Sequence, residues 1–222
     1  MSSPQSSRRV ARRRGALVLT AVTSTVTAGF AVPAASAAPA GDNVVISEVY
    51  GGGGNSGAEY THDFIELYNP TDGDISLDGW NVEYFSAKGG SGGTTQLNGT
   101  IPAGAHYLIQ QAQGNGGSTA LPAADATGSL AMSATKGSVQ LSDGAGEAVD
   151  LVGFGNASLS EGTPAQAPNN QNSVQRDETG TDTDDNSADF TAGEPSPAGT
   201  GGGVAPEPGT DPQPQDPPAE GE

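Results

Sequence analysis

Short runs of alternating apolar and polar residues, separated by turn residues, recur along most of the chain. The clearest are Val44–Tyr50, Phe64–Asn69 and Trp80–Phe85, and in the second run Ile65 and Leu67 share one face. Because successive side chains of a strand point to opposite faces, this pattern predicts β-strands. Further strands are predicted at Gln96–Asn98, His106–Gln110, Ser129–Met132, Ser138–Ser142 and Ala148–Phe154. No window shows a helical period with caps, so the chain is predicted to be all-β and to form a β-sandwich.

Two glycine-rich segments match short catalytic or nucleotide-binding patterns. Gly52–Gly57 has the spacing G-x-G-x-x-G, but a dinucleotide site needs a helix directly afterwards, and Phe64–Asn69 alternates as a strand. Gly89–Gly93 matches G-x-S-x-G, which requires a strand-to-helix turn and an acid and a histidine around the serine. The chain has only His62 and His106. Both segments are therefore interpreted as loops, and we expect no enzymatic activity.

The N-terminus resembles an export signal. Five arginines between Arg8 and Arg14 precede the apolar run Ala16–Val32, and Ala35–Ala37 offers a small-residue cleavage site. This order predicts a signal peptide over residues 1–37 that is cleaved after Ala37 and a secreted, extracellular protein. A retained membrane anchor is the alternative, but the run is short and carries several Ser and Thr residues, so we expect no stable membrane span.

Charge and cysteine content narrow the classes of partner. Five of the eight basic residues lie in the predicted signal, which leaves Lys88, Lys136 and Arg176 against 26 acidic residues, a net charge of −23. Such a chain has no basic patch to displace the counterions of a phosphate backbone, so direct, metal-free nucleic-acid binding is not expected. The absence of cysteine excludes disulfides and thiolate metal sites.

The composition changes again near the C-terminus. Residues 199–222 are rich in Pro, Gly and acidic residues, with Val204 almost the only apolar side chain. A segment of this composition cannot offset the entropy lost on ordering, so it is predicted to be a disordered tail or linker. Residues 42–197 are long enough for one domain with one core. The tail suggests either a free end or a chain cut short of a second domain.

The acidic segment before the tail carries candidate metal ligands. Residues 182–186 place oxygen-bearing side chains at alternate positions, as the first half of a calcium loop does. The full EF-hand pattern fails, because Ser187 replaces the glycine and Gly193 replaces the closing carboxylate. A looser calcium loop remains open as a prediction, with the ligands Asp182, Asp184, Asn186 and Asp189. The alternative is a solvated acidic turn that Phe190 tethers to the core.

Other polar groups are expected to have structural roles. His62 and Asp63 lie near several acidic residues in the sequence, and a metal or acid–base site is one interpretation. They stand at a loop–strand junction, where polar side chains commonly cap a strand, so a structural role is favoured. Arg176 is predicted to form an internal ion pair with Glu161 or Asp189, because its planar fork suits carboxylates.

Several segments in a fixed order resemble the bacterial lamin-tail domain. They are ISEVYGGGGN, DFIELYNPTD, LDGW, LNGTIPAG and HYLIQ, followed by EGTPA, SVQR and DTDDNSADF. The resemblance covers Asp42 to Pro197 and is greatest to the kind that precedes secreted endonuclease/exonuclease/phosphatase-type nucleases. It implies an immunoglobulin-like β-sandwich without catalytic residues. On that basis the core candidates are Ile46, Val49, Phe64, Ile65, Leu67, Trp80, Val82, Leu108, Val139, Leu141 and Leu151.

The favoured function is that of an exported, non-catalytic, monomeric module that binds or tethers to an extracellular or cell-surface partner of unknown identity. One alternative is the targeting half of a truncated extracellular nuclease whose catalytic domain is absent. Another is a calcium-stabilised surface adhesion module. Apart from calcium, no cofactor is expected.

Overall fold

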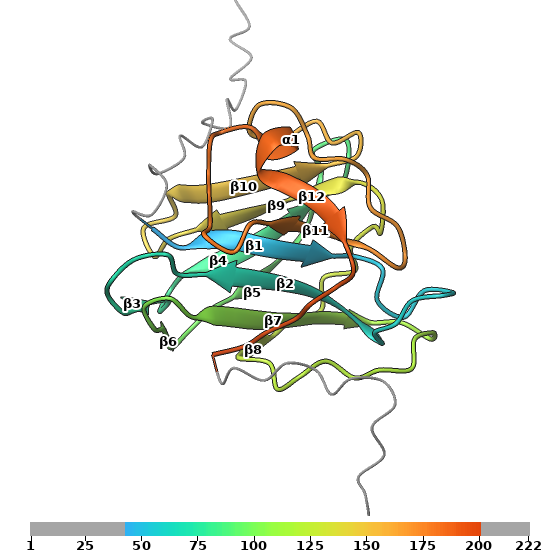
Figure 1. Ribbon diagram of the computed structural model, residues 1–222, viewed down its shortest axis with the longest axis horizontal. Coiled ribbons are helices and arrows are strands. Elements are labelled where there is room, and N and C mark those ends of the chain that lie inside the picture. Colours follow the sequence, from blue (N-terminus) through green and yellow to red (C-terminus); the bar gives the residue numbers. More distant parts are fainter. Residues whose placement is uncertain (1–42, 201–222) are drawn as a thin grey trace, which may run out of the picture. The chain divides into compact units, whose positions relative to one another are not determined.

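The computed structural model describes residues 43–200, which form twelve strands and one short helix (Figure 1). The predicted signal peptide and nearly all of the predicted tail lie outside the described residues. The first strands are β1 (Val45–Tyr50), β2 (His62–Tyr68), β3 (Ile75–Ser76), β4 (Asn81–Phe85), β5 (Ser91–Gln96) and β6 (Thr100–Ile101). They are followed by β7 (His106–Gln113), β8 (Ala126–Thr127), β9 (Gly137–Ser142), β10 (Ala148–Phe154), β11 (Ser173–Arg176), α1 (Asn186–Asp189) and β12 (Phe190–Gly193).

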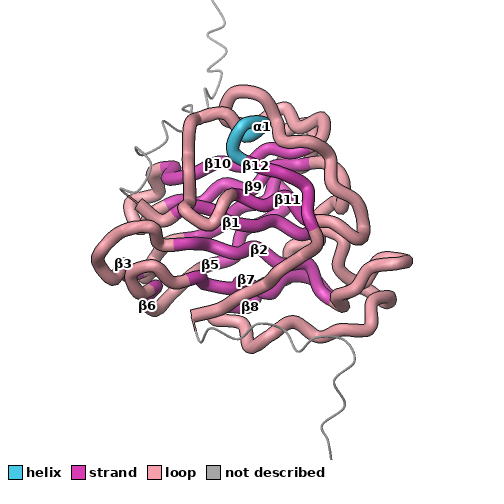
Figure 2. Tube along the Cα trace, in the orientation of Figure 1, coloured by secondary structure: helices cyan, strands magenta, loops and turns pink. Residues whose placement is uncertain are grey.

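Two large sheets contain most of the strands. The larger has the order β12-β11-β1-β2-β7-β8, the other has the order β10-β9-β4-β5, and β3 pairs with β6 in a small separate sheet. All pairs are antiparallel except that of β7 with β8. Figure 2 shows that loops connect the strands throughout, with α1 as a single helical turn. The predicted all-β class is confirmed.

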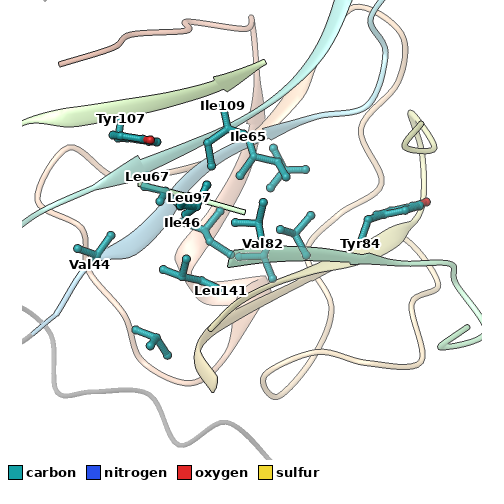
Figure 3. Packing of buried hydrophobic residues seen from close by; sticks show 14 of the residues in the cluster. Val44, Ile46, Ile65, Leu67, Val82, Tyr84, Leu97, Tyr107, Ile109 and Leu141 are labelled. Carbon is teal, nitrogen blue, oxygen red and sulfur yellow. The ribbon is translucent and has the colours of Figure 1, made fainter. Parts of the chain in front are cut away.

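The main core lies between the two large sheets. Ile46, Ile65 and Ile109 from the larger sheet meet Val82 and Leu141 from the smaller one, as Figure 3 shows. The alternation predicted for Phe64–Asn69 is confirmed, because Ile65 and Leu67 belong to this core whereas Phe64 does not. Every predicted core residue is buried except Trp80, which is partly buried and packs against the edge of the core. Trp80 was expected within a strand, but β4 begins one residue later.

A second apolar cluster covers part of the outer face of the larger sheet. Tyr50, Tyr60, Phe64 and Leu108 form it, with the ring centroids of Tyr50 and Phe64 5.4 Å apart. Leu121, from the segment between β7 and β8, packs against the same cluster. Both faces of β1 and β2 are therefore buried, which explains why apolar residues such as Tyr50 and Phe64 also lie on the face turned away from the main core.

The segment Pro195–Thr200, here called the C-terminal strap, crosses the remaining outer face. It runs from β12 across β1 and β2 toward β8 (Figure 1). The backbone N–H of Ser196 donates to Glu48 at 3.0 Å, and that of Ala198 donates to Glu66 at 2.6 Å. The N–H of Thr200 donates to Asp125 at 3.0 Å. The strap thus adds backbone donors to carboxylates that also accept hydrogen bonds from Gln175, His106 and the Leu108 N–H.

Several local predictions were wrong. Ser129–Met132 is not a strand, and only Gln96 of the predicted strand Gln96–Asn98 lies in a strand. Strand β5 begins inside the glycine-rich segment 89–93 that was interpreted as a loop. Strands β11 and β12 were not predicted, because they are four residues long and mostly polar or small. They are stabilised by pairing with β1 and with each other, which no local pattern reveals.

Candidate functional site

Arg176 organises a buried polar centre at the edge of the sandwich. Its side chain is fully buried, and its guanidinium contacts Asp150 on β10 at 3.1 Å, Asp182 at 3.2 Å and Asp189 at 3.5 Å. It also donates to the backbone carbonyl of Ile46 at 3.1 Å and stacks over the ring of Phe190. The predicted ion pair with Asp189 is therefore confirmed. Asp150 and Asp182 were not predicted as partners.

Asp150 could have been found from the sequence. It is the one charged residue in the otherwise apolar strand Ala148–Phe154, and a carboxylate buried within a strand requires hydrogen bonds or a cation. Both requirements are met, since Asp150 also accepts from the backbone N–H of Ile46 at 2.6 Å. The sequence does not show which basic residue pairs with Asp150. Arg176 is 26 residues away in the chain, and only the order of the strands brings the two together.

The four predicted calcium ligands do not share one set of partners. Asp182 and Asp189 point toward Arg176, and Asp189 also accepts from the backbone and the hydroxyl of Thr183. The side-chain oxygen of Asn186 accepts from two backbone N–H groups, at 2.7 and 3.1 Å. Asp184 is exposed, with a left-handed backbone at φ 60°. The loop built from these four residues stays a prediction.

Three carboxylates do converge, and only one of them belongs to the predicted loop. Oxygen atoms of Asp150, Glu161 and Asp182 all lie within 4.8 Å of one another, and all three residues are buried. Burial, followed by the nearby charges of Asp150 and Asp182, raises the pKa of Glu161 to about 9. Burial also raises the pKa values of Asp150 and Asp182, with Arg176 opposing the rise in each.

The other acidic residues near His62 do not form one site. Asp63 accepts from the backbone N–H groups of Gly53 and Met132, both at 2.9 Å. Burial raises the pKa of Asp63 to about 7. Glu66 instead pairs with His106 at 2.7 Å, and this hydrogen bond raises the pKa of His106. These contacts agree with the structural role favoured from the sequence.

Two open cavities lie at the end of the sandwich that carries the glycine loop. One, of about 350 Å³, is lined by Gly57, Ala58, Glu59, Gln171, Asn172 and Glu194. The other, of about 460 Å³, is lined by Ser56, Gly57, Thr135, Asn169, Asn170 and Gln171. We call residues 56–59 and 169–172 together the loop-end surface. The glycine loop leads into a strand, so its interpretation as a connecting loop is confirmed.

The two segments of this surface are joined to each other and to the sheet. The side chain of Asn170 donates to the carbonyl of Ser56 at 3.0 Å and accepts from Asn55 at 3.2 Å. The hydroxyl of Tyr50 donates to the carbonyl of Asn170 at 2.6 Å. The loops of this surface are thus hydrogen-bonded to each other and to β1, and they carry several side-chain amide groups.

Comparison with known proteins identifies the domain. The family model described as Lamin Tail Domain matches residues 37–156. The chain belongs to the lamin tail domain family. This is a non-catalytic, immunoglobulin-like family, consistent with the sandwich seen here. In the structure the lamin tail sandwich continues beyond the matched residues, because β11 and β12 complete its larger sheet.

A solved structure is similar to part of the chain. A DUF4876 family protein from Bacteroides thetaiotaomicron has a crystal structure that aligns with a TM-score of 0.46 and 15% sequence identity, covering 67% of this chain and 70% of that one. No curated protein matches the chain. Within residues 43–200, no helix is long and apolar enough to cross a membrane.

Proposed function

We propose that this lamin tail domain protein is exported and acts outside the cell as a non-catalytic module that binds or tethers through its loop-end surface. The observation that carries the proposal is the pair of adjoining cavities on hydrogen-bonded loops at one end of the sandwich. Binding residues are commonly found on loops that a rigid scaffold positions. Export rests on the basic, apolar and small-residue order of residues 1–37.

The outer face of the larger sheet suits this role less well, because the aromatic cluster and the C-terminal strap occupy it. The loop-end surface, in contrast, offers amide donors and acceptors with few charges, lined by residues such as Asn169, Asn170 and Gln171. Such groups hydrogen-bond to neutral polar partners. The net charge, −18 for the full chain and −23 after the proposed signal cleavage, disfavours polyanions.

Export is tested by fractionating cells that produce the full chain and sequencing the N-terminus of the protein in the medium or envelope. We expect the protein outside the cytoplasm, beginning at Ala38. An intact N-terminus on a cytoplasmic protein would contradict export. It would not affect the separate proposal that the loop-end surface binds a partner.

Binding is tested by co-sedimentation of the purified protein with the insoluble envelope fraction of the producing cells. Gln171 and Gln96 are both exposed, but Gln96 ends β5 opposite Asn81, next to the segment that leads to β6 and away from the loop-end surface. We expect Gln171→Ala to lower retention several-fold and Gln96→Ala to leave it unchanged. Equal retention of both variants would contradict the assigned surface, and metal-dependent nuclease or phosphatase turnover by the pure protein would contradict a non-catalytic role.

A further inference from the structure

The carboxylates of Asp150, Glu161 and Asp182 come from three separate parts of the chain. Asp150 lies on β10, Glu161 lies in the segment after it, and Asp182 precedes α1. The three residues are only 0%, 4% and 8% exposed, yet their oxygen atoms lie within 4.8 Å of one another. Like charges this close and this buried repel strongly unless protons or a cation intervene.

The described part of the chain supplies too little positive charge to balance them. Arg176 is the basic residue at the centre, whereas Lys88 and Lys136 are exposed elsewhere. Asp189 is a fourth carboxylate at Arg176, so one guanidinium faces four carboxylates and three negative charges remain when all are ionised. A divalent cation would neutralise two of these charges. Asp189 also accepts hydrogen bonds from Thr183.

Glu161 provides an independent indication of a missing ligand. Its Oε1 atom is buried and has no hydrogen-bond partner among the described residues. Its Oε2 atom receives a single bond from Asn186 at 3.3 Å. A buried acceptor without a partner is rare in folded proteins and calls for an explanation such as a bound ion. One oxygen of this carboxylate lies within 4.8 Å of oxygens of Asp150 and Asp182, so the carboxyl group that carries the unpartnered atom belongs to the convergent group.

We propose that Asp150, Glu161 and Asp182 bind a calcium-class divalent cation. The donors are all carboxylate oxygens, which hard cations prefer, and there is no cysteine or nearby histidine that would favour zinc. Mg²⁺ usually keeps several of its bound waters, whereas Ca²⁺ accepts a set of protein carboxylates in a flexible geometry. Three buried carboxylates therefore suit calcium better than magnesium. The cation would connect β10 to the acidic segment.

This site differs from the calcium loop predicted from the sequence, because the two share only Asp182. The distinction can be tested with charge-matched variants. Glu161→Gln removes a ligand charge from the buried group, Asp184→Asn does the same in the exposed loop, and Glu178→Gln is an exposed control. Thermal unfolding of the purified full chain is measured at pH 7.4 with CaCl₂, with MgCl₂ and with EDTA.

We expect calcium at about ten times its dissociation constant to raise the melting temperature of the wild type by about 3–5 °C over EDTA. Magnesium should raise it less. Glu161→Gln should lose the calcium response while melting in EDTA no lower than the wild type, because the neutral amide, like the protonated carboxyl group, places no negative charge beside Asp150 and Asp182. Asp184→Asn and Glu178→Gln should keep the full response.

Calorimetric titration of calcium into the wild type should give one site per chain. Three results would overturn the proposal: no calcium response in the wild type, an unchanged response in Glu161→Gln, or loss of the response in Asp184→Asn alone. The first would mean that protons neutralise the cluster, and the last would place calcium in the exposed loop.

Discussion

Replacing Arg176 with methionine should destabilise the protein severely. The substitution keeps an unbranched apolar stem next to Phe190 but removes the guanidinium that contacts Asp150, Asp182 and Asp189. It also leaves two buried or half-buried backbone carbonyls, those of Ile46 and Thr181, without their donor.

The magnitude follows from burial. Breaking a buried ion pair by removing one partner costs about 3–5 kcal/mol, and each orphaned buried carbonyl adds about 1–3 kcal/mol. Carboxylates that lose the cation can bind protons, which offsets part of this. We expect a net loss of about 4 kcal/mol at pH 7.5, a large share of the roughly 5–15 kcal/mol that stabilises a typical domain.

Urea unfolding in EDTA, followed by far-ultraviolet circular dichroism, measures the loss. Lys88→Met is the matched control, because it removes one positive charge from an exposed position. The loss in Arg176→Met should shrink at pH 5.5, where protons more readily neutralise the abandoned carboxylates. A loss below about 1 kcal/mol, or one equal to that of Lys88→Met, would refute the role assigned to Arg176.

Three further predictions concern other parts of the sandwich. Gly53→Ala should lower the free energy of unfolding by about 1–3 kcal/mol or more, because its Cβ would lie 1.9 Å from the carbonyl carbon of His62. Gly73→Ala is the control: its Cβ would meet nothing within 4 Å, so the melting temperature should not change. Burial raises the pKa of Glu48 from 4.5 to about 7, so the native state binds this proton more tightly than the unfolded state does. The associated stability should be present below pH 4.5 and be lost as the pH rises to 7, and Glu48→Gln should remove up to about 3 kcal/mol of that pH dependence in urea unfolding. Phe64→Ala should lower the free energy of unfolding by about 3–5 kcal/mol. It should also speed hydrogen exchange in the segment between β7 and β8, because Leu121 and Ala124 of that segment pack against the same cluster. If Phe64 packed only between the two sheets, exchange in that segment would not change.

Hydrogen exchange would also test how the strap is held. Its N–H groups donate to Glu48 and Glu66, so the exchange of Ser196 and Ala198 should be slow compared with that of exposed loops. The pairing joins residues 148 and 132 positions apart in the sequence. No local pattern could have indicated it.

The sequence alone was enough to establish the all-β class and several of the main strands. Alternation within Phe64–Asn69 is a local property, because side chains of one strand change faces at every residue whatever the strand pairs with. The same reasoning correctly predicted that Gly52–Gly57 is a connecting loop followed by a strand and not by a helix.

The tertiary structure decided which charges meet. Placement of β11 next to β1 brings Arg176 to Asp150, and the segment after β10 brings Glu161 to the same group. Sequence spacing could suggest ligands only within residues 182–189, because electrostatic interactions depend on distance and burial, which chain separation does not report. The pattern of residues thus determined the strands, while the order of strands in the sheet created the buried acidic centre.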